Sequence, residues 1–308
     1  MLWTSLSLLF VTLLGSGVSG APKPLARGPI DSLRASIGRR VAEVKNAVVG
    51  VAFRDLATGD TLFLNADDSF HAASTMKVPV MIELFRRVDS HALRLDQGIL
   101  LINKFGSIVD GSPYELDPGS DSDSSAYALT GTRVTVRELI DRMITRSSNL
   151  ATNALIELVT ASSANATAHA LGATHIRVLR GVEDGKAFRA NLNNSTTARD
   201  LAVLLDAIET GKAASRSSCD AMREVLTRQE FNDEIPAGLP AGVKVAHKTG
   251  WITGVRHDAA IVYPPGRKPY VLVVLTRDIP DDTVARRLIA DISRLVYTAV
   301  APANAASQ

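Results

Sequence analysis

The sequence has few cysteines, few aromatic residues and almost no excess charge, and these shortages exclude several classes of protein. Cys219 is the only cysteine among the 308 residues, so the chain can form no intramolecular disulfide and has no Cys-rich metal site. We expect Cys219 to be a small apolar residue. The 34 basic and 32 acidic side chains leave a net charge of +2, far from the basic excess typical of nucleic-acid-binding proteins. Nucleic acid is therefore not expected as a partner.

Motifs of the common hydrolases and nucleotide-binding proteins are also missing. The chain has no Gly-x-Ser-x-Gly elbow, no His-Glu-x-x-His zinc motif and no phosphate-binding loop ending in Gly-Lys-Ser/Thr. Its six histidines show no metal-ligand spacing, so we expect no metal and no other cofactor. These absences disfavour metallohydrolases and α/β-hydrolases.

The first 20 residues are typical of a secretory signal peptide. They carry no charged side chain and contain an apolar run over residues 8–14, followed by small residues. The run is short for a membrane span, although the absence of preceding basic residues leaves an uncleaved anchor as the alternative. We expect a secreted or periplasmic protein with no stable membrane contact after the signal is cleaved.

Strand patterns occur at both ends of the remaining sequence, and helical patterns lie between them. The strand patterns cover residues 47–53, 61–64, 243–247, 259–263 and 270–275. The helical patterns cover residues 33–44, 135–146, 150–159, 196–209, 221–226 and 284–299. Strands from the two ends can share one antiparallel sheet only if the middle of the chain is an excursion from it.

The resulting prediction is an α+β fold with two domains. A discontinuous antiparallel-sheet α/β domain takes residues 21–68 and 229–308, and a helical domain takes residues 69–228. The cleft between them is the natural place for a site. Residues 106–125 combine Gly, Ser and Pro with four aspartates but lack the glycine and terminal glutamate of an EF-hand, so we expect a solvated surface loop or hairpin.

Ser74-Thr75-Met76-Lys77 is the only Ser-x-x-Lys in the sequence. If Ser74 opens a helix, residues three apart share a face, and the Lys77 amine can reach the Ser74 hydroxyl. A buried lysine can have its pKa lowered enough to act as a base toward a serine hydroxyl. Alone, the four residues are explained as simply by a helix-capping serine and a surface lysine.

Two further motifs change this interpretation. Ser147-Ser148-Asn149 falls between two helical patterns, and Lys248-Thr249-Gly250 ends a strand pattern. In this order the three motifs resemble the active site of the class A β-lactamases and the related penicillin-binding proteins, whose motifs run Ser-x-x-Lys, Ser-Asp-Asn and Lys-Thr-Gly. The resemblance extends over nearly the whole mature chain. It implies a β-lactamase/transpeptidase-like fold.

The resemblance also implies acyl transfer through a covalent intermediate. Ser74 is then the nucleophile, Lys77 and Glu183 are the candidate bases, and Ser147 passes a proton toward the departing nitrogen. The resemblance also implies the substrate-binding residues. They are Asn149 for the amide side chain of the substrate, Lys248, Thr249 and Arg256 for its carboxylate, and Trp251 beside the site. The backbone N–H groups of Ser74 and Trp251 are expected to form the oxyanion hole.

Several positions depart from the family pattern. Ser148 replaces the middle aspartate of the second motif, and Trp251 follows the third motif where small residues are usual. Glu183 matches the family's deacylating glutamate in position and type, with Asp184 as its nearest rival. Ala187 stands where an asparagine is usual, so we expect water positioning to differ. The candidates for that role are Asn191, Asn193 and Asn194.

The leading functional hypothesis is a serine hydrolase that opens β-lactam rings. The alternatives are a D-alanyl-D-alanine peptidase or esterase with the same Ser/Lys site, and a β-lactam-binding sensor that is acylated without turnover. Glu183 favours the first, because a fast β-lactamase needs a base for deacylation. The expected partner is a small-molecule β-lactam or a peptidoglycan-like substrate, and the expected oligomeric state is a monomer.

Overall fold

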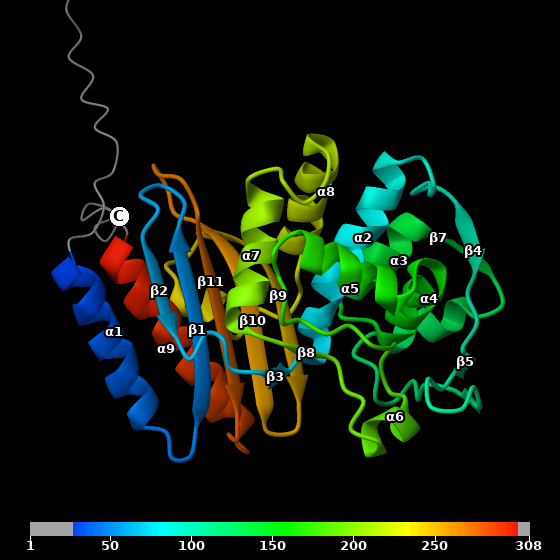
Figure 1. The fold of residues 1–308 in the computed structure, drawn as a ribbon, viewed down its shortest axis with the longest axis horizontal. Coiled ribbons are helices and arrows are strands. Elements are labelled where there is room, and N and C mark those ends of the chain that lie inside the picture. The colour runs from blue at the N-terminus through cyan, green and yellow to red at the C-terminus, as the bar shows by residue number, and fades with distance from the viewer. Residues whose placement is uncertain (1–26, 301–308) are drawn as a thin grey trace, which may run out of the picture.

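The computed structural model describes residues 27–300, and the signal-peptide prediction for residues 1–20 lies outside this range. One antiparallel sheet, in the order β2-β1-β11-β10-β9, joins strands from both ends of the chain (Figure 1). Its strands are β1 (Val48–Asp55), β2 (Thr61–Leu64), β9 (Lys244–Ile252), β10 (Val255–Tyr263) and β11 (Tyr270–Arg277). The sheet is therefore discontinuous in sequence, as the strand patterns predict.

Helices cover both faces of this sheet (Figure 1). On one face lie α1 (Arg27–Ala42) and α9 (Asp282–Val300), which pack side by side; on the other lie α7 (Ala198–Glu209) and α8 (Arg216–Thr227). Because side chains alternate along a strand, Val51 and Phe53 face the first pair of helices and Ala52 faces the second. This two-sided burial explains the continuous apolar runs of the central strands.

A helical layer extends beyond the edge strand β9. It contains α2 (Lys77–Asp89), α3 (Val136–Thr145), α4 (Asn149–Val159) and α5 (Ala161–Ala170). Residues 77–85 of α2 are all buried, because other helices pack against it on several sides. The short elements are β3 (Phe70–His71), η1 (Ala73–Met76), β4 (Gly98–Leu100), β5 (Phe105–Gly106), β6 (Pro113–Tyr114), η2 (Ser124–Leu129), β7 (Arg133–Thr135), α6 (Gly185–Arg189), β8 (Ser195–Thr196) and η3 (Pro236–Gly238).

The predicted fold class is confirmed, and the element boundaries agree where the apolar pattern is strong. The strands predicted at residues 47–53 and 61–64 form the antiparallel pair of β1 and β2, and α9 begins beside Asp281, whose carboxylate accepts the Thr283 N–H at 2.8 Å. The pattern misses the start of β10, because near its start the strand has the polar run Arg256-His257-Asp258, which is buried.

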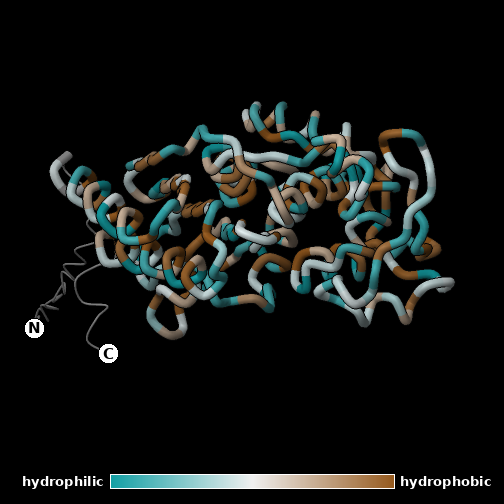
Figure 2. The backbone as a smooth tube through the Cα atoms, turned by 90° about the horizontal axis from the view of Figure 1, so that it is seen from below, coloured by the Kyte–Doolittle hydropathy of each residue, from teal (hydrophilic) through white to brown (hydrophobic). Residues whose placement is uncertain are grey.

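Hydrophobic and hydrophilic residues alternate along the helices at the surface of the molecule (Figure 2). No helix within residues 27–300 is long and apolar enough to span a membrane.

The acidic segment is only partly the solvated loop that its composition predicts. Asp110 and Asp117 are exposed, and β5 and β6 form a short hairpin within it. Asp121 and Asp123, however, are buried, so the prediction is wrong for them. Asp123 pairs with Arg142 at 2.9 Å, and Asp121 binds backbone N–H groups at the start of α4. These partners come from distant parts of the chain, which local composition cannot reveal.

Candidate active site

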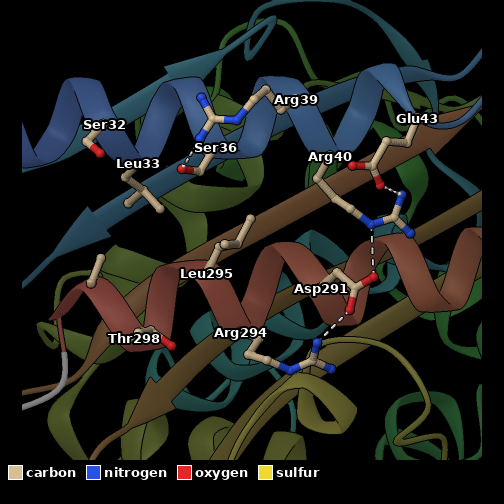
Figure 3. Close-up of a pocket in the computed structure, with 11 residues that line it drawn as sticks. Ser32, Leu33, Ser36, Arg39, Arg40, Glu43, Asp291, Arg294, Leu295 and Thr298 are labelled. Atoms are coloured by element: carbon tan, nitrogen blue, oxygen red, sulfur yellow. Dashed lines mark hydrogen bonds and ion pairs between the residues drawn. The ribbon is translucent and has the colours of Figure 1, made fainter.

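A cleft of about 760 Å³ contains Ser74 and draws its walls from six parts of the chain. They are the segment 71–74, the loop 120–122, the first residue of α4, the segment 180–188, Asn194 before β8, and residues 251–253 at the end of β9. A second hollow, of about 690 Å³, lies between α1 and α9 (Figure 3). It contains none of the three motifs, and its Arg40 and Arg294 both pair with Asp291. The chemistry of the chain therefore belongs to the first cleft.

Ser74 lies in η1, directly before α2, on a turn that strains the backbone. Ala73 has a φ of 45°, a conformation that residues with side chains rarely adopt, and its N–H donates to His71 Nδ1 at 3.1 Å. Gly250 of β9 lies against this turn. A Cβ at Gly250 would stand 3.0 Å from the backbone nitrogens of Ser74 and Thr75, so only glycine allows this approach. The third motif is thereby brought to the first.

Lys77 is fully buried beneath the cleft floor, and all three of its ammonium protons are used. Nζ donates to Ser147 O at 2.7 Å, Ser147 Oγ at 3.1 Å and Asn149 Oδ1 at 3.0 Å. Burial lowers the pKa of Lys77 to about 7, against the opposing charges of Asp121 and Glu183. Within residues 27–300 the Ser74 hydroxyl has no hydrogen bond, neither to Lys77 nor to another group, so it is free to turn toward a substrate.

Ser147 receives hydrogen bonds from two buried lysines. Lys248 Nζ donates to Ser147 Oγ at 3.1 Å and to Thr249 O at 2.9 Å. Burial and the nearby Lys77 charge both hold the pKa of Lys248 well below its usual range. A hydroxyl has two acceptor lone pairs and one proton. Since the two amines occupy the acceptor sites, the Ser147 proton remains available to an incoming ligand.

Asp121 is a component of the site that the sequence reasoning missed. Its carboxylate accepts the N–H groups of Asn149 at 2.9 Å and Leu150 at 3.0 Å, at the N-terminus of α4. A carboxylate there is favoured by the helix dipole as well as by the hydrogen bonds. Ser148, the departure from the Ser-Asp-Asn motif, caps α4 by accepting the Ala151 N–H at 3.3 Å. The buried carboxylate thus comes from position 121 instead of position 148.

Glu183 lies at the cleft, as its match to the family pattern predicts. Its Oε1 accepts a hydrogen bond from Asn149 Nδ2 at 2.6 Å, while Asn149 Oδ1 accepts from Lys77. One amide therefore links the lysine to the glutamate. Partial burial raises the pKa of Glu183, and the Asn149 hydrogen bond opposes this rise. Its φ of 60° shows that the loop is held in a conformation that few residues tolerate.

Asp184, the rival to Glu183, has a structural role. It is buried and caps α6 by accepting the Ala187 N–H at 3.0 Å, and it also accepts from Ser107 Oγ at 3.0 Å. Asn153 holds the same loop from the other side. Its amide pairs with both the N–H and the C=O of Val182, at 2.7 and 3.1 Å. The direction of the Glu183 side chain is consequently set by its two neighbours.

The three loop asparagines do not fit the predicted water-positioning role. Asn194 is buried and uses its amide on the backbone of Leu179 and Arg180, at 2.8 and 3.0 Å. Asn193 Oδ1 accepts from Arg180 Nη2 at 3.0 Å, and Asn193 Nδ2 donates to Asn191 Oδ1 at 3.3 Å. These side chains fix the shape of the loop. Within the described residues, Glu183 accepts hydrogen bonds from Asn149 and, at 3.5 Å, from Ser120.

Thr249 and Trp251 both belong to β9, but of the two only Trp251 lines the cleft. Thr249 is fully buried, and within the described residues its hydroxyl has no hydrogen-bond partner. An unpaired buried hydroxyl is costly unless a ligand or water satisfies it. Trp251 is half-buried and lines the cleft, followed by the exposed Ile252 and Thr253.

Arg256 is placed differently from its predicted role. It is buried, and it does not line the cleft. Its Nη1 donates to Glu234 Oε1 at 3.0 Å and its Nε to Asp282 Oδ1 at 3.2 Å. Its guanidinium is committed to two carboxylates of the protein, so in this structure Arg256 is not turned toward the place of a substrate carboxylate.

This sheet, with helices on both faces and the motif-bearing cleft beside β9, is a β-lactamase/transpeptidase-like α+β fold. The profile of the β-lactamase enzyme family matches residues 32–300, and the chain belongs to that family as a class A member. The chain is 31% identical over 273 residues to β-lactamase AST-1 of Nocardia asteroides, covering 85% of this chain and 83% of that protein.

Solved structures agree with this membership. A β-lactamase from Sphaerobacter thermophilus matches with a TM-score of 0.76 at 28% identity, covering 88% of this chain and 97% of that chain. A mutant of PBP-A, solved as an acyl-enzyme complex with penicillin G, matches with a TM-score of 0.74 at 28% identity, covering 87% of this chain and 96% of that chain.

Proposed function

We propose that the protein is a serine β-lactamase that hydrolyses β-lactam antibiotics through an acyl-enzyme on Ser74. One observation carries the proposal: two buried lysines, Lys77 and Lys248, converge on Ser147 beside a cleft that holds both Ser74 and a carboxylate, Glu183. This arrangement offers a nucleophile, proton carriers and a base for water in one place.

Acylation begins when Ser74 Oγ attacks the lactam carbonyl carbon. Lys77, or Glu183 through a water, takes the serine proton; the lowered pKa of Lys77 supports an amine that can be neutral near pH 7. The N–H groups of Ser74 and Trp251 stabilise the oxyanion, each such donor being worth about 3 kcal/mol. Collapse of the intermediate breaks the C–N bond, and Ser147 gives its proton to the departing nitrogen and receives, through Lys77, the proton that was taken from Ser74.

Deacylation needs a water and a base. Glu183 takes a proton from the water as its oxygen attacks the ester carbonyl, the bond between that carbon and Ser74 Oγ breaks, and Ser74 receives the proton from Glu183 by way of Lys77. The hydrogen bonds of Asn149 support this role, because they hold the Glu183 carboxylate beside Lys77. Lys248 and the unpaired Thr249 hydroxyl are the proposed partners of the substrate carboxylate, and Asn149 contacts the amide side chain.

A D-alanyl-D-alanine peptidase is the second candidate, and two observations favour it. Ala187 supplies no amide for a second contact to the deacylating water, and the neighbouring asparagines are used by the loop itself. The chain also matches, over 87% of its length, a PBP-A mutant that was solved with penicillin G bound as an acyl-enzyme. In either case we propose that the protein acts outside the cytoplasm, as a secreted or periplasmic monomer on a small-molecule substrate.

Time-resolved intact mass spectrometry with benzylpenicillin separates these functions. A β-lactamase gives an adduct of the mass of the drug that appears and clears while hydrolysed drug accumulates. An adduct that persists identifies a peptidase-like or sensor-like protein. If neither adduct nor hydrolysis is observed, the proposed function is wrong for penicillins, and simple esters are the next substrates to test.

A further inference from the structure

A buried ionic cluster lies behind the β9 wall of the cleft, and the proposed mechanism does not use it. Its centre is Arg256 of β10, paired with Glu234 on one side and with Asp282 of α9 on the other. The side chains of Arg256 and Glu234 are only 4% and 1% exposed. Burial, with the nearby Asp258 charge adding to it, raises the pKa of Glu234 to about 7, and the Arg256 charge opposes this rise. Paired buried charges of this kind are costly to assemble.

The cluster reaches the cleft through one side chain, Trp251. Arg256 and Trp251 are directly opposite each other on adjacent antiparallel strands, and the Arg256 guanidinium lies over the indole at 5.1 Å from the ring centroid. Phe231 meets the same indole edge to face, with ring centroids 4.9 Å apart. A cation over an indole and an edge-on aromatic contact each stabilise the position of the ring.

These contacts fix an indole whose own backbone matters to the mechanism. Trp251 follows Gly250, the residue whose missing Cβ allows β9 to approach Ser74. Its N–H is the second donor of the proposed oxyanion hole. A displacement of about 1 Å in a positioned catalytic group can cost a hundredfold in rate.

We propose that Arg256 is a positioning residue: held between Glu234 and Asp282, it clamps Trp251 against Phe231 and so fixes the end of β9 where the oxyanion is stabilised. The inference rests on the proposed function, because it assigns a purpose to the cluster within that reaction. It replaces the contact with the substrate carboxylate that the sequence predicts for Arg256.

A role for Arg256 in positioning Trp251 and a role in binding the substrate carboxylate predict different responses to the charge of the substrate. A positioning residue acts equally on benzylpenicillin and on its methyl ester, which lacks the carboxylate. A residue that binds the carboxylate acts on the acid alone. The comparison uses Arg256→Lys, which keeps the positive charge but loses the planar guanidinium. Arg286→Gln is the matched control, because Arg286 also donates to Asp282, at 3.1 Å, and has no ring contact with Trp251.

The expected result is a fall in kcat/KM of roughly tenfold to a hundredfold for both the acid and the ester in Arg256→Lys. Arg286→Gln should leave kcat/KM unchanged for both the acid and the ester. Replacing Arg256 by a neutral residue alone would leave the buried Glu234 unpaired and endanger folding. The double variant Glu234→Gln/Arg256→Gln keeps the pair neutral and should reproduce the loss. A loss confined to the acid overturns the proposal.

A second measurement does not depend on turnover. The chain has two tryptophans, Trp3 and Trp251, so in a Trp3→Phe background the fluorescence reports Trp251 alone. Arg256→Lys should move the emission to longer wavelength and increase quenching by acrylamide, because the released indole becomes more exposed. Unchanged emission and quenching overturn the clamp.

The two readouts also separate this inference from the function on which it rests. If the wild-type protein forms no adduct and hydrolyses no penicillin, the proposed function fails, while the fluorescence of Arg256→Lys still tests the clamp. Non-additivity is the final check: once Trp251→Ala has released the strand end, adding Arg256→Lys should cost little more in kcat/KM. Full additivity of the two losses contradicts the proposal.

Discussion

At the scale of single residues, two side chains connect the charged groups of the site to one another. Asn149 bonds both Lys77 and Glu183, and Ser147 accepts from both lysines. The sequence predicts these residues as members of one site, through the order of three motifs and, for Glu183, through its match to the family's glutamate. It does not predict Asp121, because Asp121 and Asn149 lie 28 positions apart in the chain, which conceals the contact.

Ser74→Ala should abolish covalent labelling by benzylpenicillin. The methyl group removes the nucleophilic oxygen but fits the same space at the start of α2. Intact mass spectrometry of the folded variant checks this result. An adduct of unchanged mass and rate in Ser74→Ala would assign the nucleophile to another residue.

Glu183→Gln should still acylate but should release product slowly, with a fall in kcat of about a hundredfold or more. The amide keeps the shape of the side chain and removes the base. Glu115→Gln, an exposed carboxylate outside the cleft, is the control. Wild-type turnover in Glu183→Gln would move the deacylation role elsewhere.

The pH dependence of acylation should identify the first base. The Lys77 amine must be neutral to accept a proton, and its pKa is lowered to about 7, so the acylation rate should rise as the pH increases through about 7. The Glu183 charge raises the pKa of Lys77, so in Glu183→Gln the midpoint should move to lower pH. Stopped-flow acylation rates from pH 5 to 9 measure both. An unchanged midpoint in the variant would mean that Lys77 is not the titrating group.

At the scale of elements, the N-terminus of α4 organises the cleft. Ser147 has a φ of 58° immediately before the helix, and Asp121 holds the first two N–H groups of the helix from outside. The helix itself follows from its apolar pattern, and the sequence predicts it within one residue. The exact direction of Ser147 and Asn149 depends on the Asp121 contact, which is tertiary.

Asp121→Asn should loosen this helix start. The amide retains one acceptor but loses the charge that favours the helix N-terminus, so we expect a loss of about 1–3 kcal/mol in the free energy of unfolding and slower acylation. Thermal denaturation and stopped-flow acylation measure the two effects. Asp117→Asn, an exposed aspartate of the same loop, is the control. If the two variants have the same stability and the same acylation rate, Asp121 does not hold the start of α4 in the way proposed.

At the scale of the whole molecule, the sheet connects the two ends of the described chain and supports the cleft at its edge. Leu288 of α9 is fully buried against the sheet on the face away from the cleft. Leu288→Ala should therefore cost about 2–5 kcal/mol of stability. The acylation rate measured well below the melting temperature should stay unchanged, because α9 and the cleft lie on different sides of the sheet. A selective loss of acylation without loss of stability would contradict this separation.

The sequence by itself determined the fold class, most of the helices and strands, and the residues of the three motifs, because apolar periodicity and motif order are local properties of the chain. Only the tertiary structure decided which polar groups meet. It brought Asp121 to α4, joined Asp184 to Ser107 and committed Arg256 to Glu234 and Asp282. Each of these contacts joins residues whose spacing carries no periodic signal, and a buried charge takes whichever opposite charge or N–H group the packing places beside it.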